Sequence, residues 1–148
     1  MGQTTAATVP VVPFVHWTTT NAPQALPQGF GAMSETAYKE LLWHALLRGV
    51  DSFVMWCPDP EMASEVKPVH EVYAASLDYA SFLDKGTPVT FDVPEQPGTV
   101  VSGLALDKKL LVRRTDFSDS KEPVEITVDG KAIKVPRLDG ACAILSVP

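Results

Sequence analysis

The pattern of hydrophobic and polar positions divides the chain into two parts. In the first part, two short apolar runs at residues 11–17 and 51–56 are each followed by a segment whose apolar residues recur at helical spacing, at 34–49 and 68–85. This order predicts a β-α-β-α arrangement. Because both runs are almost continuously apolar, as in strands covered by helices, we expect the two strands to pair in parallel.

Residues with known preferences mark the ends of both helices. Ser34 suits the N-cap of the first helix, and Gly49 suits the position after its last turn. Pro68 suits the first turn of the second helix, and Gly86 suits the position just after that helix. The stretch 18–33, rich in Thr, Pro, Gln and Gly, is predicted to be a long loop.

After Gly86 the apolar residues recur with period two, which is typical of short antiparallel strands. Asp129-Gly130 is a strong signal for a type I′ hairpin, and Asp107-Lys108 predicts another tight turn. The sequence thus predicts an α/β fold followed by an all-β fold. A βαβα unit occupies 1–86, and a small antiparallel β-sandwich or partial barrel occupies 87–148, with strands at 89–93, 100–106, 110–116, 124–128, 132–135 and 143–147.

Composition and charge exclude several classes of function. The chain has 148 residues, of which 45% are apolar, so it is long and apolar enough for one ordinary domain or two small ones. A net charge of −6 argues against a nucleic-acid partner. No apolar run approaches the ~20 residues that span a bilayer, and residues 1–8 lack the features of a signal peptide. We therefore expect a soluble protein with neither nucleic acid nor a membrane as partner.

Polar and aromatic residues gather where the two predicted strands end: His16, Trp17, Trp56 and Cys57. Ligands of parallel α/β sheets bind at the carboxyl ends of the strands. A tryptophan face suits the C–H groups of a sugar ring, and a histidine beside it can bond a hydroxyl or move a proton. The alternative is that both tryptophans are core residues.

Three carboxylates follow the second strand: Asp59, Glu61 and Glu65. All three are predicted on one loop, whereas a catalytic pair is usually supplied by different strands so that the two groups flank the scissile bond. Carboxylates exposed to water are the plainer interpretation. We expect Asp59 or Glu61 to lie at the rim of a sugar subsite, and no catalytic acid or base can be assigned.

A second interpretation pairs Cys57 with His16 as nucleophile and base. No cysteine-hydrolase signature surrounds Cys57, so an inert buried thiol is favoured. His16, His44 and His70 are dispersed and have no partner at metal-ligand spacing. The sequence therefore predicts no metal and no cofactor, and two cysteines are too few for a disulfide framework.

Charged and aromatic residues alternate at 113–117, at the end of one predicted strand. Period-two alternation puts Arg113 and Thr115 on one face and Arg114 and Asp116 on the other. This stretch could contact a glycan or the first half of the chain. We expect a salt bridge between the two halves rather than a binding site.

The stretch YKELLWHALLRGVDSFVMW at 38–56 resembles the seventh helix and eighth strand of a (β/α)8-barrel glycoside hydrolase. By this resemblance 11–17 is the seventh strand, 69–83 is the eighth helix, and 87–148 is the β-sandwich that often follows such barrels. Segment 1–86 is then a partial TIM-barrel unit. Strands one to six have no counterpart here. His16-Trp17 stands where the large retaining clan of these enzymes carries its nucleophilic glutamate.

The resemblance implies the C-terminal part of an enzyme that cleaves a polysaccharide or oligosaccharide. Trp17 and Trp56 would stack on the sugar and His16 would bond a hydroxyl. Such a chain is expected to be inactive alone, and to self-associate or to pair with the remaining barrel strands. The alternative is a non-catalytic carbohydrate-binding or interaction module whose function lies in the β half.

Overall fold

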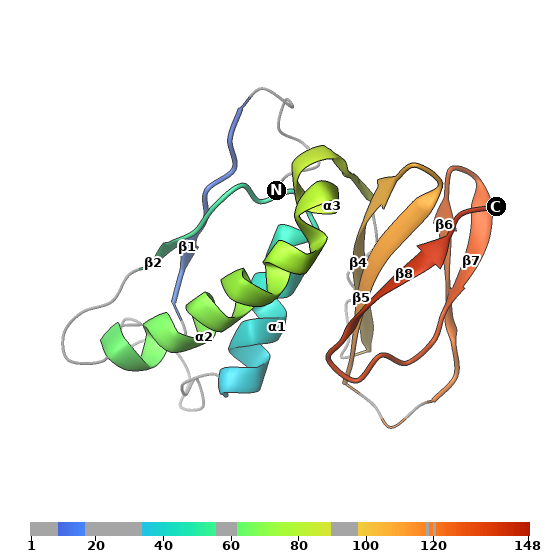
Figure 1. The fold of residues 1–148 in the computed structure, drawn as a ribbon. Helices are drawn as coiled ribbons and strands as arrows, with labels where there is room; N and C mark the ends of the chain where they lie inside the picture. The colour runs from blue at the N-terminus through green and yellow to red at the C-terminus, as the bar shows by residue number, and fades with distance from the viewer. Residues whose placement is uncertain (1–8, 17–33, 56–61, 90–97, 118, 120) are drawn as a thin grey trace, which may run out of the picture.

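The computed structural model describes residues 9–16, 34–55, 62–89, 98–117, 119 and 121–148. Three α-helices, a short 3-10 helix and eight strands are found there (Figure 1). The elements of the first half are β1 (Phe14–Val15), α1 (Glu35–Leu46), β2 (Val54–Met55), α2 (Met62–Ser76), η1 (Leu77–Tyr79) and α3 (Ala80–Lys85). The second half contains β3 (Thr87–Val89), β4 (Thr99–Leu106), β5 (Lys109–Asp116), β6 (Val124–Val128), β7 (Lys131–Val135) and β8 (Cys142–Ser146).

The first two strands pair in parallel, as predicted, and α1 connects them. Phe14 is paired with Val54, and Val15 with Met55. Both strands are shorter than the apolar runs that predicted them, because only these residues form the regular ladder. Next to the ladder, the Asp51 N–H donates to the carbonyl of Val11 at 3.0 Å. The β-α-β-α order of the first half is therefore confirmed.

Helix α1 begins where its cap residue predicts. The hydroxyl of Ser34 accepts a hydrogen bond from the Ala37 N–H at 3.1 Å, which satisfies one of the backbone donors left open at a helix start. After the helix ends, Gly49 has φ +81°, a left-handed conformation that favours glycine. The structure thus confirms the predicted roles of Ser34 and Gly49 at the two ends of this helix.

The second helix differs from the prediction at both ends. Helix α2 begins at Met62, so Pro68 lies inside it rather than in its first turn. The helix thus continues across a residue that normally ends or kinks one. At the other end, Gly86 has φ −72°, so it is not a left-handed cap. A Cβ at Gly86 would lie 2.4 Å from the carbonyl oxygen of Phe82, so close packing is the reason for glycine here.

The second half is built from antiparallel strands. One sheet has the order β3-β4-β5-β8, and β6 pairs with β7 in a separate two-stranded sheet. Asp107 and Lys108 have φ 49° and 60°, and Asp129 and Gly130 have φ 51° and 76°. Both hairpins therefore turn with two positive φ angles, which is the type I′ geometry predicted for Asp129-Gly130, and Asp107-Lys108 forms the tight turn predicted there.

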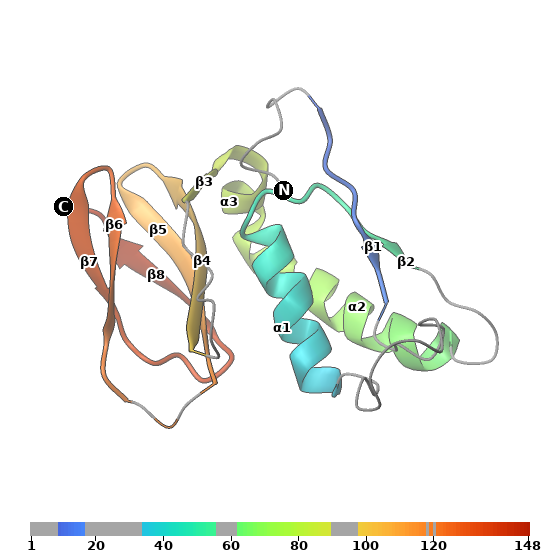
Figure 2. The same cartoon turned by 180° about the vertical axis from the view of Figure 1, so that it is seen from behind.

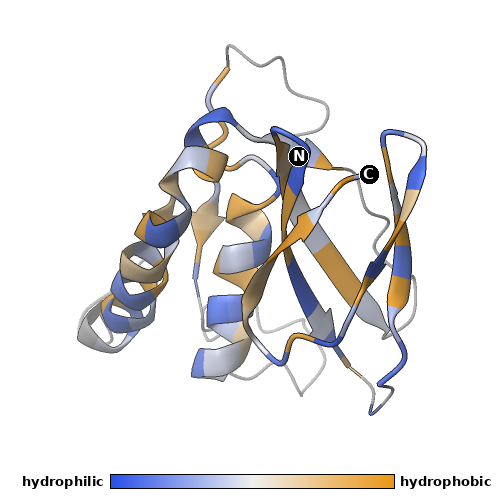
Figure 3. Ribbon diagram, turned by 45° about the vertical axis from the view of Figure 1, so that its right-hand side comes forward, coloured by the Kyte–Doolittle hydropathy of each residue, from blue (hydrophilic) through white to orange (hydrophobic). Residues whose placement is uncertain are grey.

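The elements are stacked in layers, as Figures 1 and 2 show. The β1–β2 pair lies on one side of α1 and α2, the four-stranded sheet lies on the other side, and β6–β7 lies beyond that sheet. Each helix carries both hydrophobic and hydrophilic residues (Figure 3), as expected where only part of its surface is packed. The structure is thus mixed α/β, with its antiparallel strands in the C-terminal half. None of the described helices has the length and apolar character needed to cross a membrane.

Three hydrophobic clusters hold these layers together. The first cluster lies between β1–β2 and the helices, and its buried members are Val15, Tyr38, Leu42, Trp43 and Val72. A second cluster joins the helices to the four-stranded sheet, and its buried members are Leu47, Phe82, Leu104 and Leu111. The third lies between the two antiparallel sheets and includes Leu110, Val112, Val128 and Val135. The helical layer is therefore packed on both sides.

Candidate functional site

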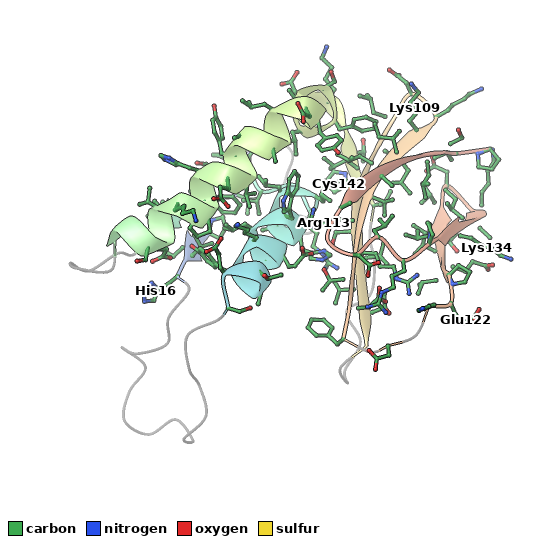
Figure 4. The ribbon with its side chains drawn as sticks, turned by 60° about the horizontal axis from the view of Figure 1, so that its bottom comes forward. His16, Lys109, Arg113, Glu122, Lys134 and Cys142 are labelled. Carbon is green, nitrogen blue, oxygen red and sulfur yellow. The ribbon has the colours of Figure 1, made fainter. Side chains whose placement is uncertain are left out.

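His16 follows β1 directly, at the carboxyl end of that strand. Its Nδ1 lies 3.1 Å from Oε2 of Glu65, and 19% of its side chain is exposed. Figure 4 shows this side chain at the strand end, away from the antiparallel sheets. The predicted location of His16 at the end of a parallel strand is confirmed, whereas its contact with a sugar stays a prediction.

Glu65 belongs to α2 and is completely buried. The hydroxyl of Tyr38, on α1, donates to Oε1 of Glu65 at 2.7 Å. We call His16, Tyr38 and Glu65 the His16 cluster. Tyr38 lies on α1, Glu65 on α2 and His16 directly after β1, and the hydrophobic cluster around Val15 brings these three elements together. The site is thus built on packed elements.

The position of Glu65 corrects the prediction that it is a loop carboxylate in water. The sequence placed the start of the helix at Pro68, and the structure places it at Met62. Because the helix begins six residues earlier than predicted, Glu65 lies within it, and its side chain is buried. A buried carboxylate must be hydrogen-bonded, and Tyr38 and His16 supply two of its partners.

The arrangement has a defined chemical capacity. Glu65 accepts from the Tyr38 hydroxyl at Oε1 and lies within hydrogen-bond distance of His16 Nδ1 at Oε2, so it orients both groups. An imidazole held in this way at a strand end can bond a ligand hydroxyl or transfer a proton. The cluster contains one carboxylate, whereas ordinary glycoside hydrolysis uses two. The described members of the cluster therefore provide a binding or positioning group.

The other predicted site residues lie outside the described residues. These are Trp17, Trp56, Asp59 and Glu61, together with Cys57. Their roles stay predictions. What the structure adds is the register of the strands they follow: Val15 is paired with Met55 in parallel, so β1 and β2 end at the same edge.

The remaining histidines, His44 and His70, lie on different helices, α1 and α2. Among the described residues no group of three or more His, Cys, Asp or Glu side chains could hold a metal ion. His70 is exposed on α2. His44 lies on α1 with its two ring nitrogens 2.9 Å from the Ser102 hydroxyl and 2.8 Å from the Thr115 hydroxyl. Both ring nitrogens of His44 therefore lie within hydrogen-bond distance of a hydroxyl.

A salt bridge joins the two halves of the chain, as predicted. Arg113, on β5, donates from Nε and Nη2 to the two carboxylate oxygens of Glu40, on α1, at 3.0 and 2.5 Å. Its guanidinium also lies 5.0 Å from the ring centroid of Trp43. On the other face of β5, Arg114 forms an ion pair with Asp116. The predicted alternation of faces is therefore correct.

Five polar residues continue this contact between α1 and the sheet: Glu40, His44, Arg48, Ser102 and Thr115. We call them the seam cluster. Arg48 can only donate, and it donates to the Ser102 hydroxyl at 2.8 Å, while Thr115 donates to the Glu40 carboxylate at 2.5 Å. Because Thr115 uses its proton on Glu40, Nε2–H of His44 is the donor to Thr115, and in a neutral imidazole Nδ1 then accepts from the Ser102 hydroxyl.

The lowered pKa of His44 keeps its imidazole uncharged at neutral pH. Burial lowers the pKa of His44 to about 4, a shift that Arg48 and Arg113 reinforce and Glu40 opposes. Burial acts to raise the pKa of Glu40, but hydrogen bonds from Arg113 and Thr115 outweigh it and the pKa is lowered. The seam cluster is thus arranged for a charged Glu40 beside an uncharged imidazole.

A small polar cavity of about 310 Å³ opens next to the seam cluster. It lies between the start of α1 and the end of β5, and its lining includes Thr36, Glu40, Asp116, Arg137 and Asp139. Hydroxyl, carboxylate and guanidinium groups of this kind can bond sugar hydroxyls. The cavity is a second place where a small polar ligand could be held.

Comparison of this chain with models of known protein families, with curated proteins and with solved structures finds no match.

Proposed function

We propose that this chain is the C-terminal part of a glycoside hydrolase that acts on a polysaccharide or oligosaccharide. The first half would be the last two βα units of a (β/α)8 barrel, and the second half a β-sandwich domain that follows it. The order β1-α1-β2-α2, the parallel pairing of β1 with β2 and the packing of both helices on one face of the pair support this proposal.

The observation that carries the proposal is the uncovered face of the parallel pair. Phe14 and Val54 are paired with each other, and 73% and 40% of their surfaces are exposed. Val15 and Met55, one position further along, pack against the helices. Strand residues alternate between faces, so Phe14 and Val54 lie on the face opposite the helices.

Parallel sheets are almost always covered on both faces. In a closed barrel the inner face is covered by the side chains of the other strands. Burying a phenylalanine side chain contributes about 1.5–3 kcal/mol, so leaving Phe14 in water forgoes a stabilisation of that order. Six further barrel strands would cover this face, and we propose such strands, or a second copy of the chain, as its partner.

Each predicted residue has a role in the proposal. Trp17 and Trp56 form the floor on which a sugar ring stacks, and His16 bonds a sugar hydroxyl. Asp59 and Glu61 lie at the rim of the same subsite. The catalytic carboxylates belong to other strands of the barrel, so the chain alone binds sugar without cleaving it.

The size of the protein in its source cells tests the larger part of the proposal. An antibody raised against residues 87–148 captures the native protein, and mass spectrometry gives its mass. A species much larger than 16.0 kDa is expected. A species of 16.0 kDa would contradict the proposal that the chain completes a barrel enzyme.

Sugar binding tests the site itself. The chain is titrated with a panel of cello-, xylo-, malto- and chito-oligosaccharides, and Trp56→Ala is compared with Phe117→Ala. Phe117 is an exposed aromatic residue just after β5, in the other half of the chain. Loss of binding in Trp56→Ala alone supports the barrel subsite, whereas binding unaffected by Trp56→Ala contradicts it.

A non-catalytic carbohydrate-binding or interaction module is the second candidate function. The polar cavity beside the seam cluster favours it, because that cavity lies at the junction of α1 and β5, away from the ends of the parallel strands. In this case Arg137→Ala, in the lining of the cavity, abolishes binding of the panel sugars and Trp56→Ala does not.

A further inference from the structure

We propose that the polar cavity between α1 and β5 is a binding site for a neutral sugar ring, and that Asp116 is the residue that accepts a hydrogen bond from one of its hydroxyl groups. This inference rests on the second candidate function and deepens it, because it names the class of ligand and the residue that selects it. It does not depend on a sugar subsite at the ends of β1 and β2.

The carboxylate of Asp116 is used on one side only. Its Oδ1 accepts from the Thr99 hydroxyl at 2.6 Å and from Nε of Arg114 at 2.9 Å, and Nη2 of Arg114 lies 2.8 Å from the same oxygen. Within the described part of the chain no group donates to Oδ2. Only 3% of this side chain is exposed, and Asp116 is part of the cavity lining. Buried polar atoms need partners, so we assign to Oδ2 a partner that enters the cavity.

The ionisation of Asp116 decides what that partner must bring. Burial acts to raise the pKa of Asp116, but hydrogen bonds from Thr99 and Arg114 outweigh it and the pKa is lowered. The group is therefore charged at neutral pH, and a charged carboxylate only accepts hydrogen bonds. The ligand atom that meets Oδ2 must carry a proton, as a hydroxyl or an ammonium group does.

The charges around the cavity select between these two donors. Its lining contains three carboxylates, each ion-paired with an arginine: Glu40 with Arg113, Asp116 with Arg114, and Asp139 with Arg137. Because each negative charge is balanced by a neighbour, the cavity offers little net attraction to a cation. The described residues also contain no group of three or more His, Cys, Asp or Glu side chains that could hold a metal ion. A neutral hydroxyl is therefore the favoured donor.

A sugar ring fits the remaining features of the cavity. Its hydroxyl groups both donate and accept, and the lining supplies the Thr36 hydroxyl and the Asp139 carboxylate besides Asp116. The volume of about 310 Å³ lies at the lower end of the roughly 300–1,000 Å³ that is typical of small-molecule sites. The cavity is thus suited to a single ring.

The test is proton–nitrogen-15 NMR of the whole chain during titration with the oligosaccharide panel. The backbone amide signals of Thr36 and Gly140 report on the cavity, and those of Val15 and Met55 report on the strand ends. Saturable shifts of the Thr36 and Gly140 signals are expected with a neutral sugar. Shifts confined to Val15 and Met55 overturn this proposal and support the barrel subsite. If no panel sugar shifts any signal, this proposal and the proposed function both fail.

A variant of Asp116 tests its role as the acceptor. In Asp116→Asn the amide oxygen is needed by Thr99 and Arg114, which places the NH₂ group where Oδ2 was and replaces an acceptor with a donor. The affinity should fall about 10- to 100-fold, the value of a hydrogen bond to a charged group. Asp119→Asn makes the same change at an exposed carboxylate outside the cavity lining, and should bind as the wild type does. Unchanged affinity in Asp116→Asn overturns the assignment.

A second variant serves if Asp116→Asn does not fold. Thr36 is exposed in the first turn of α1 and lines the cavity, so Thr36→Trp fills the space and leaves the Asp116–Arg114 pair in place. Sugar-induced shifts of the Gly140 signal should disappear in this variant and persist in Thr36→Ser, which keeps the hydroxyl. Persistence of these shifts in Thr36→Trp overturns the cavity as the site.

The neutral character of the ligand has its own test. The panel sugar that shifts the cavity signals is compared with its amino analogue, in which an ammonium group replaces one hydroxyl on each ring. The analogue should bind no more tightly, and raising the salt concentration from about 0.01 M to about 1 M should leave the affinity for the neutral sugar unchanged. An analogue that binds about tenfold more tightly at low salt overturns the choice of a neutral ligand.

Discussion

Acidification should destabilise the protein through His44, before most of its carboxylates are protonated. The imidazole is held neutral between the Ser102 hydroxyl and the Thr115 hydroxyl, and burial lowers its pKa from 6.5 to about 4. In the unfolded chain the ring takes up a proton near pH 6.5. Between these two values the unfolded state therefore binds more protons than the folded state, and stability falls as the pH falls.

The size of the effect follows from the two pKa values. Each pH unit between 6.5 and about 4 is worth about 1.4 kcal/mol, so the full loss is about 3 kcal/mol. Below about pH 4 both states are protonated and His44 contributes no further loss. Glu40, whose pKa is lowered from 4.5, adds a second loss of stability only below pH 4.5. The interval from 6.5 to 4.5 therefore isolates most of the His44 contribution.

Urea unfolding followed by circular dichroism measures this dependence between pH 6.5 and 4.5. The part of this loss that falls between pH 6.5 and 4.5 is about 2 kcal/mol, a substantial part of the roughly 5–15 kcal/mol that stabilises a typical domain. In His44→Gln the amide can both donate and accept but does not titrate, so the slope over this interval should largely vanish. His70→Gln, at an exposed position of α2, is the matched control and should keep the wild-type slope. A wild-type slope in His44→Gln would falsify the reasoning.

Three further predictions concern the packing of the layers. Arg113→Met leaves the Glu40 carboxylate without its bidentate partner, so the free energy of unfolding, measured in urea, should fall by roughly 3–5 kcal/mol; an effect below about 1 kcal/mol would contradict a buried role for the pair. Gly86→Ala places a Cβ 2.4 Å from the carbonyl oxygen of Phe82 and should lower the melting temperature more than Gly130→Ala does. At Gly130 a Cβ meets nothing within 4 Å, so only the left-handed backbone conformation is strained there. A larger effect of Gly130→Ala would refute the packing explanation. Phe14→Glu should abolish any self-association seen by analytical ultracentrifugation, because it places a charge on the uncovered face of the parallel pair; persistence of the same oligomer excludes that face as the interface.

Features that depend on neighbours in the sequence were predicted well. Ser34 caps α1, Asp129-Gly130 forms a hairpin turn with two positive φ angles, and the strands from β4 to β8 lie within one or two residues of their predicted bounds. Side-chain caps, turn conformations and period-two alternation are properties of a few adjacent residues. The sequence alone was sufficient for these.

The start of α2 shows where local signals fail. Pro68 is a good residue for a first helical turn, and nothing nearby in the sequence shows that the helix already begins at Met62. Packing of Val69 and Val72 against the first hydrophobic cluster compensates for the hydrogen bond that proline cannot donate. The misplaced start also hid Glu65, because a residue taken for part of a loop is expected in water.

The sequence by itself determined the order of the elements, the turns and the two-faced character of β5. Only the tertiary structure decided which polar groups meet. Tyr38 and Glu65 are 27 positions apart, and Glu40 and Arg113 are 73 apart, so no spacing rule connects them. These side chains become neighbours because α1 packs between the two sheets. When α1 packs between the two sheets, each buried polar side chain needs a hydrogen-bond partner on a neighbouring element. This requirement explains the Tyr38–Glu65 and Glu40–Arg113 pairs, which the sequence could not reveal.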